Sequence, residues 1–171
     1  MSATSSGETV AAGGLAFDRD GEVVETSPVR NETVSSIATC LAAMGGVALF
    51  IDYGHERSGA GDTLQAVRGH AYAAVLADPG EQDLTSHVDF EAVANSARDA
   101  GASVTPLVGQ GEWLIRLGIE ARAQALSRAN PEKAAGVQAA LERLTSRAQM
   151  GDLFKAIAIH SPDWPVPAGF A

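Results

Sequence analysis

An uncharged run at residues 47–51, Val-Ala-Leu-Phe-Ile, constrains the fold of this chain more than any other feature. It follows a glycine pair at residues 45–46 and leads directly into Asp52. A strand that reads as a continuous apolar run is typically buried on both faces, as in a parallel sheet covered by helices. Ligands of open α/β sheets bind outside the carboxyl ends of such strands. The sequence therefore predicts an α/β fold, with Asp52, Tyr53 and His55 at a functional edge of the sheet.

Helix and strand patterns alternate along the rest of the chain. Ser27 and Pro28 predict the start of a helix, as N-cap and first helical residue, and the glycine pair predicts its end. Asp20 and Gly21 predict a hairpin turn, and residues 63–77 fit either a short helix or an extended segment. The apolar stripe of the first helix consists of Val34, Ile37, Ala38, Leu41 and Met44. The other predicted elements are a helix at 89–100 capped by Asp89, a strand at 104–108, helical segments between 112 and 144, and a last strand at 153–159.

Composition bounds the class of protein. The chain has 171 residues and 46% hydrophobic content, enough for one domain with its own core at residues 14–171. Its net charge of −9, from 12 basic and 21 acidic residues, argues against a surface for nucleic acid or anionic membranes. The single cysteine, Cys40, excludes an internal disulfide and is expected to pack as a small core residue.

The start of the chain carries no targeting pattern. Residues 1–13 are polar and small, which predicts a disordered leader and no secretory signal. No apolar run approaches the ~20 residues that a membrane span requires. A cytoplasmic protein is therefore expected.

Several short motifs follow one another between residues 50 and 170. They are Phe50-Ile51-Asp52-Tyr53-Gly54-His55, Asp62-Thr63-Leu64-Gln65, Pro79-Gly80, Asp83-Leu84-Thr85-Ser86-His87-Val88-Asp89-Phe90, Gln110-Gly111, Leu117-Gly118-Ile119, Met150-Gly151-Asp152-Leu153-Phe154-Lys155 and Pro167-Ala168-Gly169-Phe170. In this order they resemble the MidA family of S-adenosylmethionine-dependent methyltransferases, which includes a mitochondrial complex I assembly factor. The resemblance implies the C-terminal half of a Rossmann-like methyltransferase sheet, with an antiparallel seventh strand and a helical insertion before that last strand.

The resemblance also implies a chemistry. It implies S-adenosylmethionine as cofactor, a protein arginine as methyl acceptor, and a subunit of respiratory complex I as partner. Asp52 or Asp83 would hold the guanidinium bidentately, while Tyr53 or His55 would orient its nitrogen or accept its proton. Gly54 is expected to adopt a positive φ and to let a ligand approach. Alternatively, the carboxylate of Asp52 satisfies backbone N–H groups at the turn.

The densest polar cluster of the sequence is a candidate substrate-binding site. It consists of Asp83, Thr85, His87 and Asp89, which point the same way if the segment is extended. Carboxylates around a histidine suit general acid–base chemistry. With Asp52 and His55 they would alternatively form a metal site. A structural role remains a third interpretation, with Asp89 as a helix cap. Arg68 is predicted either to close over this site, with His70, or to lie on a solvated face.

Cofactor-binding residues are not identified in this sequence. A Rossmann-like fold binds its cofactor at a Gly-rich turn after the first strand, and the Ala-Ala-Gly-Gly at residues 11–14 has neither a preceding strand nor a following helix. The cofactor-binding half is therefore expected to be absent, which exposes a sheet edge and leaves the activity of the chain alone undecided. A non-catalytic interaction module and a small metal-dependent hydrolase are alternative functions. Expected partners are a protein substrate and either a second copy of the chain or a complementing N-terminal half.

Overall fold

The computed structural model describes residues 21–171, which divide into two compact units. Among the described residues, the smaller unit contains residues 21–28 and 58–86, and the larger unit contains residues 29–57 and 87–171. The predicted leader at residues 1–13 and Asp20 of the predicted hairpin lie outside the described residues.

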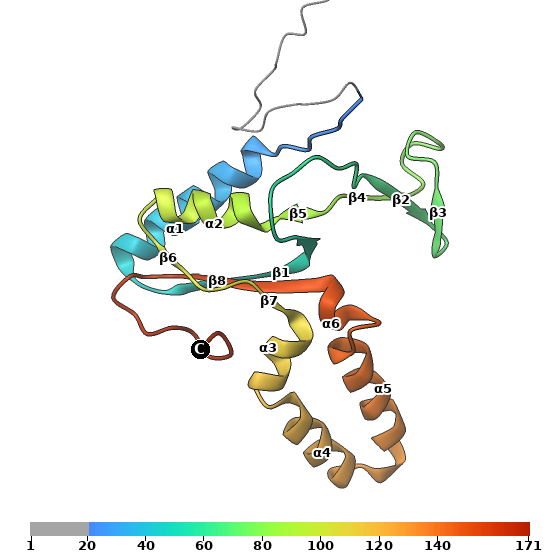
Figure 1. Cartoon of the computed structure of the whole chain (residues 1–171). Helices are drawn as coiled ribbons and strands as arrows, with labels where there is room; N and C mark the ends of the chain where they lie inside the picture. Colours follow the sequence, from blue (N-terminus) through green and yellow to red (C-terminus); the bar gives the residue numbers. More distant parts are fainter. Residues whose placement is uncertain (1–20) are drawn as a thin grey trace, which may run out of the picture. The chain divides into compact units, whose positions relative to one another are not determined.

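The larger unit is built on a sheet with the strand order β5-β1-β8-β6 (Figure 1). β1 (Val47–His55) and β8 (Phe154–His160) are antiparallel, in a register from Val47↔His160 to Tyr53↔Phe154. The antiparallel last strand implied by the resemblance is therefore confirmed. β6 (Ser103–Val104) and β7 (Val108–Gly109) also pair antiparallel with β8, while β5 (Val88–Asp89) runs parallel to the end of β1.

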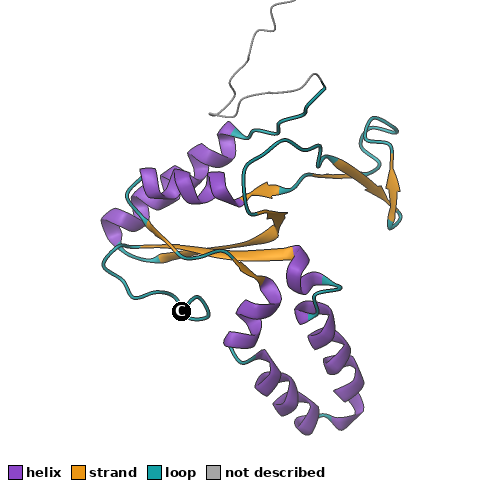
Figure 2. Cartoon of the chain, in the orientation of Figure 1, coloured by secondary structure: helices purple, strands orange, loops and turns teal. Residues whose placement is uncertain are grey.

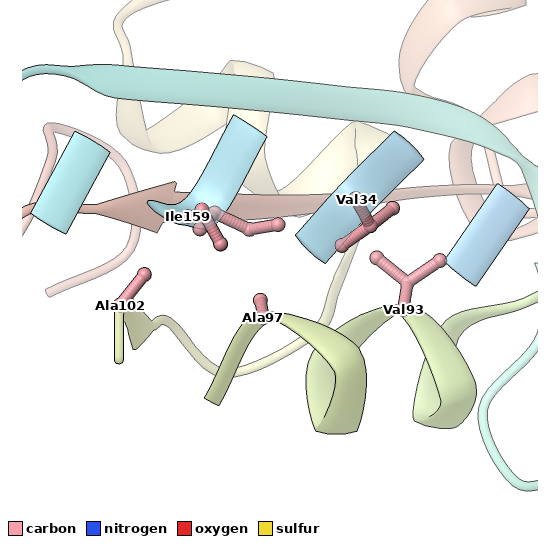
Figure 3. Packing of buried hydrophobic residues seen from close by; sticks show 6 residues of the cluster. Val34, Val93, Ala97, Ala102 and Ile159 are labelled. Carbon is pink, nitrogen blue, oxygen red and sulfur yellow. The ribbon is translucent and has the colours of Figure 1, made fainter. Parts of the chain in front are cut away.

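Two helices cover one face of this sheet. α1 (Pro28–Met44) begins and ends where the sequence predicts, and the glycine pair that follows it has φ values of +80° and +127°. α2 (Phe90–Asp99) is capped by Asp89, whose Oδ1 accepts the N–H of Ala92 at 3.0 Å. Side chains from α1, α2 and β8 interlock in the core (Figure 3). The buried residues of this cluster are Val34, Ala38, Val93, Ala97, Ala102 and Ile159.

The opposite face of the sheet is covered only in part. On β8, Ala156 and Ala158 are buried beneath Phe170, with Trp113 packed against the same cluster. The predicted strand at 153–159 is thus buried on both faces, although Leu153 belongs to a helix. The same prediction is wrong for β1, because the side chains at 47, 49 and 51 remain 44%, 45% and 40% exposed. The C-terminal segment therefore covers this face of β8 and leaves the side chains of residues 47, 49 and 51 on β1 exposed.

A helical insertion precedes the last strand, as the resemblance implies (Figure 2). It comprises α3 (Gln110–Arg116), α4 (Ile119–Ala129), the 3₁₀ helix η1 (Pro131–Lys133), α5 (Ala134–Thr145) and α6 (Met150–Leu153). Gly118, with φ +84°, separates α3 from α4, and α4 and α5 pack together as a hairpin. A shallow apolar cavity of about 200 Å³ lies between these two helices.

The smaller unit contains a three-stranded antiparallel sheet in the order β3-β2-β4. Its strands are β2 (Gln65–Arg68), β3 (Ala71–Ala73) and β4 (Asp83–Thr85). Residues 63–77 therefore contain extended structure and not a helix. Gly69 and His70 form the tight turn between β2 and β3, with φ values of +56° and +65°, as a two-residue hairpin loop requires.

Three further local expectations are wrong. Cys40 is exposed on α1, because the buried stripe of this helix contains only Val34 and Ala38 among its described residues. Met44, expected in the same stripe, is 78% exposed at the end of the helix. The predicted strand at 104–108 is two short strands separated by residues 105–107, where Pro106 has no N–H to donate to the ladder. Within the described residues, no helix combines the length and the apolar character needed to cross a membrane.

Candidate functional site

The carboxyl end of β1 carries Asp52, Tyr53 and His55. Because side chains alternate along an extended strand, Tyr53 and His55 share one face and Asp52 lies on the other. Asp52 is exposed, and its Oδ1 accepts the N–H of Tyr53 at 2.8 Å. This contact corresponds to the structural alternative for Asp52, a carboxylate bonded to a backbone N–H. It engages one carboxylate oxygen and orients the group at the end of the strand.

His55 is oriented by a backbone carbonyl. Its Nδ1 lies 2.8 Å from the carbonyl oxygen of Arg57. A carbonyl can only accept, so Nδ1 carries the hydrogen of this bond, and Nε2 of the neutral ring is then an acceptor. Because the hydrogen bond selects the tautomer, the ring presents a proton acceptor at this edge of the sheet.

Tyr53, a predicted catalytic residue, contacts His87, a predicted substrate-binding residue. Its ring meets the ring of His87 edge-on, with centroids 5.6 Å apart, and meets Phe154 in the same way at 5.5 Å. Such edge-to-face pairs are favourable because the positive edge of one ring faces the negative face of the other. The rings of Tyr53 and His87 are therefore in contact at the carboxyl end of β1.

Gly54 has a different role from the one expected. Its φ is not positive, and a Cβ at this position would lie 2.1 Å from the carbonyl oxygen of Val88. The glycine thus permits the close parallel pairing of β1 with β5. This pairing places His87 and Asp89, which flank Val88, beside the end of β1.

The remaining predicted substrate-binding residues belong to different parts of the chain. Asp89 is buried in the larger unit and caps α2. Asp83 and Thr85 are alternate residues of the extended strand β4 in the smaller unit. Arg68, in the same unit, pairs with Asp78 at 2.7 Å with both side chains largely exposed, in keeping with a solvated face.

A cavity beside the end of β1 was not anticipated from the sequence. Its volume is about 550 Å³, and it lies between β7, α3, the start of β8 and the residue that follows β1. Its lining includes Glu56, Val108, Glu112, Arg116, Asp152 and Lys155. Lys155 is the register partner of Asp52, and its Nζ donates to the backbone oxygen of Asp152. The one signal for this cavity was a lysine within an otherwise apolar strand.

The sequence Gly109-Gln110-Gly111 joins a strand to a helix, as a cofactor-binding turn would. A Cβ on Gly111, however, would lie 2.4 Å from the backbone oxygen of Thr145. The backbone at residue 145 of the same chain therefore fills the space beside this turn. No described group of three or more His, Cys, Asp and Glu residues is arranged to hold a metal ion.

Comparison with known proteins identifies related chains. Residues 2–108 match a family model described as "Putative S-adenosyl-L-methionine-dependent methyltransferase". The chain is 37% identical over 140 residues to the mitochondrial protein arginine methyltransferase NDUFAF7 homolog of Drosophila melanogaster, covering 80% of this chain and 31% of that protein. It is 33% identical over 144 residues to the mitochondrial NDUFAF7 of Mus musculus, covering 83% and 33%. The chain thus spans about a third of these relatives.

Two crystal structures from Burkholderia thailandensis share the fold. One, of an uncharacterized protein, superposes with a TM-score of 0.76 at 29% identity, covering 85% of this chain and 40% of that one. The other, a candidate methyl transferase bound to S-adenosyl-homocysteine, gives 0.75 at 28% identity, covering 85% and 39%. These similarities confirm the Rossmann-like methyltransferase fold predicted from the sequence.

The relatives correct the predicted cellular location and confirm the predicted family. The curated relatives are named as mitochondrial proteins, which overturns the cytoplasmic location expected from the sequence. That expectation relied on the first residues of a chain that spans only part of its relatives, so those residues were a poor guide. The family model covers more than half of the chain. This chain belongs to the MidA-type family of S-adenosyl-L-methionine-dependent methyltransferases.

Proposed function

We propose that this chain forms the acceptor side of a protein arginine methyltransferase site, centred on the carboxyl end of β1. The relatives in fly and mouse carry the name protein arginine methyltransferase, and the matched region includes Asp52, Tyr53 and His55. Following the family resemblance, the acceptor protein is a subunit of respiratory complex I. S-adenosylmethionine, when bound, supplies the methyl group.

The observation that carries this proposal is the hydrogen bond that orients His55 at the strand end that also carries the exposed carboxylate of Asp52. Asp52 supplies a negative charge that pairs with a guanidinium through charge-assisted hydrogen bonds. The hydrogen bond from Nδ1 of His55 to the carbonyl of Arg57 leaves Nε2 as the proton acceptor for a guanidinium nitrogen. Tyr53 and His87 provide the aromatic wall against which a planar guanidinium stacks.

Binding of an arginine peptide to the purified chain tests the acceptor role. Titration followed by NMR should show shifts at the end of β1 with an arginine peptide, and weaker binding with a matched citrulline peptide, which lacks the charge. Asp52→Asn preserves the shape of the side chain and removes its charge. A hydrogen bond to a charged group contributes about 1.5–3 kcal/mol, so this variant should bind at least tenfold more weakly.

The matched control is Asp163→Asn, which alters an exposed carboxylate in the C-terminal segment. It should bind the arginine peptide with unchanged affinity. Equal loss of affinity in both variants would indicate a general charge effect and would remove Asp52 from the site.

A non-catalytic interaction module is the second candidate function. The exposed side chains of Val47, Leu49 and Ile51 on β1 favour it, because an uncovered apolar stripe is typical of an interaction surface. Calorimetric titration of the chain with S-adenosylhomocysteine separates the two. One-to-one micromolar binding would contradict the module, whereas arginine-peptide binding without cofactor binding would support an acceptor side that requires a complementing part.

A further inference from the structure

Glu25 binds the loop that follows the candidate site along the chain. This loop, residues 58–63, belongs to the smaller unit, as does Glu25. Oε1 of Glu25 accepts the N–H of Thr63 at 2.9 Å, and Oε2 accepts the hydroxyl hydrogen of the same threonine. Earlier on both segments, the N–H of Gly61 donates to the carbonyl oxygen of Val23 at 2.8 Å. Residues 23–25 therefore hold the far end of the loop at residues 61–63.

The contact between Glu25 and Thr63 is stronger than an ordinary surface hydrogen bond. Both oxygens of the carboxylate accept a hydrogen, and hydrogen bonds to an ionised group are stronger than those between neutral groups. The two side chains are also part-buried, so water competes for them less than for an exposed pair. The residues lie 38 positions apart in the sequence, so the contact is a tertiary restraint on the loop and not a local turn.

The loop has little rigidity of its own. Residues 58–62 are Ser-Gly-Ala-Gly-Asp, and none of them lies in a helix or strand. Glycine populates more backbone conformations than any other residue. Fixing the ends of a flexible loop restricts the conformations open to the residues between them. β1 fixes one end, because the strand runs to His55, and Glu25 fixes the other.

We propose that Glu25 is a positioning residue for His55 and acts through this loop. Arg57 lies between β1 and the loop, and its carbonyl oxygen is 2.8 Å from Nδ1 of His55. While Glu25 holds Thr63, this carbonyl keeps its direction and continues to accept from Nδ1. Without that contact, the glycines let the loop rearrange, and His55 loses the partner that orients it. The inference rests on the role proposed above for His55 as a proton acceptor.

The tautomer of His55 in the purified chain is the direct test. Long-range proton–nitrogen NMR spectra distinguish a protonated Nδ1 from a protonated Nε2, and His55→Gln identifies the signals of this ring. In the unaltered chain we expect a protonated Nδ1. In Glu25→Ala we expect the signals to shift toward a mixture of the two tautomers. The amide of Thr63 should exchange about tenfold faster, because it loses a hydrogen bond to a charged group.

Two variants of the partner residue test the same contact without altering Glu25. Thr63→Ser keeps the hydroxyl and should retain the tautomer of the unaltered chain. Thr63→Val keeps the shape of the side chain and removes the hydroxyl donor, so the signals should shift part of the way. The matched control is Glu81→Ala, which removes an exposed glutamate from the same unit. It should change neither the tautomer nor the exchange rate of Thr63.

The outcomes separate this inference from the proposed function. Faster exchange at Thr63 with an unchanged His55 tautomer in Glu25→Ala overturns the proposal, because the loop would then move without affecting the ring. If circular dichroism shows that Glu25→Ala does not fold, the comparison of Thr63→Ser with Thr63→Val decides, and identical spectra overturn the proposal. A chain whose tautomer responds as expected but which binds no arginine peptide contradicts the acceptor role and leaves the positioning by Glu25 intact.

Discussion

Asp89 caps helix α2, although the sequence also suggested it as a substrate-binding residue. It is 7% exposed between β5 and α2, and its carboxylate accepts the N–H of Ala92. Helix N-termini leave backbone donors without intrahelical partners, and an Asp at the N-cap satisfies one of them. His55 shows the same principle at the candidate site, where a backbone carbonyl orients a ring of proposed function.

Replacing Asp89 by alanine should destabilise the protein by about 1 kcal/mol, within a range of roughly 0.5–2 kcal/mol, because the cap is lost. Asp89→Asn retains a side-chain oxygen as acceptor and should lose far less. Urea denaturation, followed by the helix signal in circular dichroism at ~222 nm, measures the stability of both variants. Equal destabilisation by both variants would show that the negative charge, and not the cap, is what stabilises this end of α2.

At the scale of elements, β8 is the strand on which the larger unit depends. It pairs with β1 on one side and with β6 and β7 on the other, and its residues 156–160 are buried. Between β6 and β7 the ladder is maintained by Thr105. Its N–H donates to the carbonyl of Ala158 at 3.0 Å, and its Oγ1 accepts the N–H of Ala158 at 2.9 Å.

Thr105→Val should therefore destabilise the larger unit by about 1–3 kcal/mol, because the buried N–H of Ala158 loses its acceptor. Thr105→Ser keeps the hydroxyl and should cost less, mainly through the lost methyl group. The difference in denaturation midpoint between the two variants gives the contribution of the hydroxyl. Identical midpoints would contradict a role for this hydrogen bond.

At the scale of the whole molecule, burial is uneven. The larger unit concentrates its buried side chains on β8, α1 and α2, whereas α4 buries only Ala123 and α5 buries none of its described residues. The two helices of the insertion pack mainly against each other and against the short helices beside them. Regions with few buried apolar contacts open at lower free energy than the core.

Hydrogen exchange should follow this distribution. Amides of β8 at residues 156–160 should exchange slowest, through global unfolding, while amides of α4 and α5 should exchange faster through local opening. Exchange measured by mass spectrometry over a range of urea concentrations separates the two routes, because local opening depends little on urea. Protection in α5 equal to that of β8 would mean that the insertion unfolds only with the core.

The sequence by itself determined the elements that depend on local chemistry. Pro28 and the glycine pair bound α1, Asp89 starts α2, and Gly118 with Pro131 divides the insertion. These signals act through backbone dihedrals and the orphan groups of helix ends, which a few neighbouring residues decide. The order of these elements and the short motifs were enough to predict the fold and the family.

Only the tertiary structure decided which surfaces are covered. The apolar run at 47–51 was predicted to be buried on both faces, yet one face is open, and Cys40, predicted to pack in the core, is exposed. The contact of Tyr53 with Phe154 and the cavity shared by Glu56 and Lys155 join residues far apart in the chain. Burial depends on which elements lie beside a side chain, and hydrophobic periodicity indicates only that a face should be covered, not what covers it.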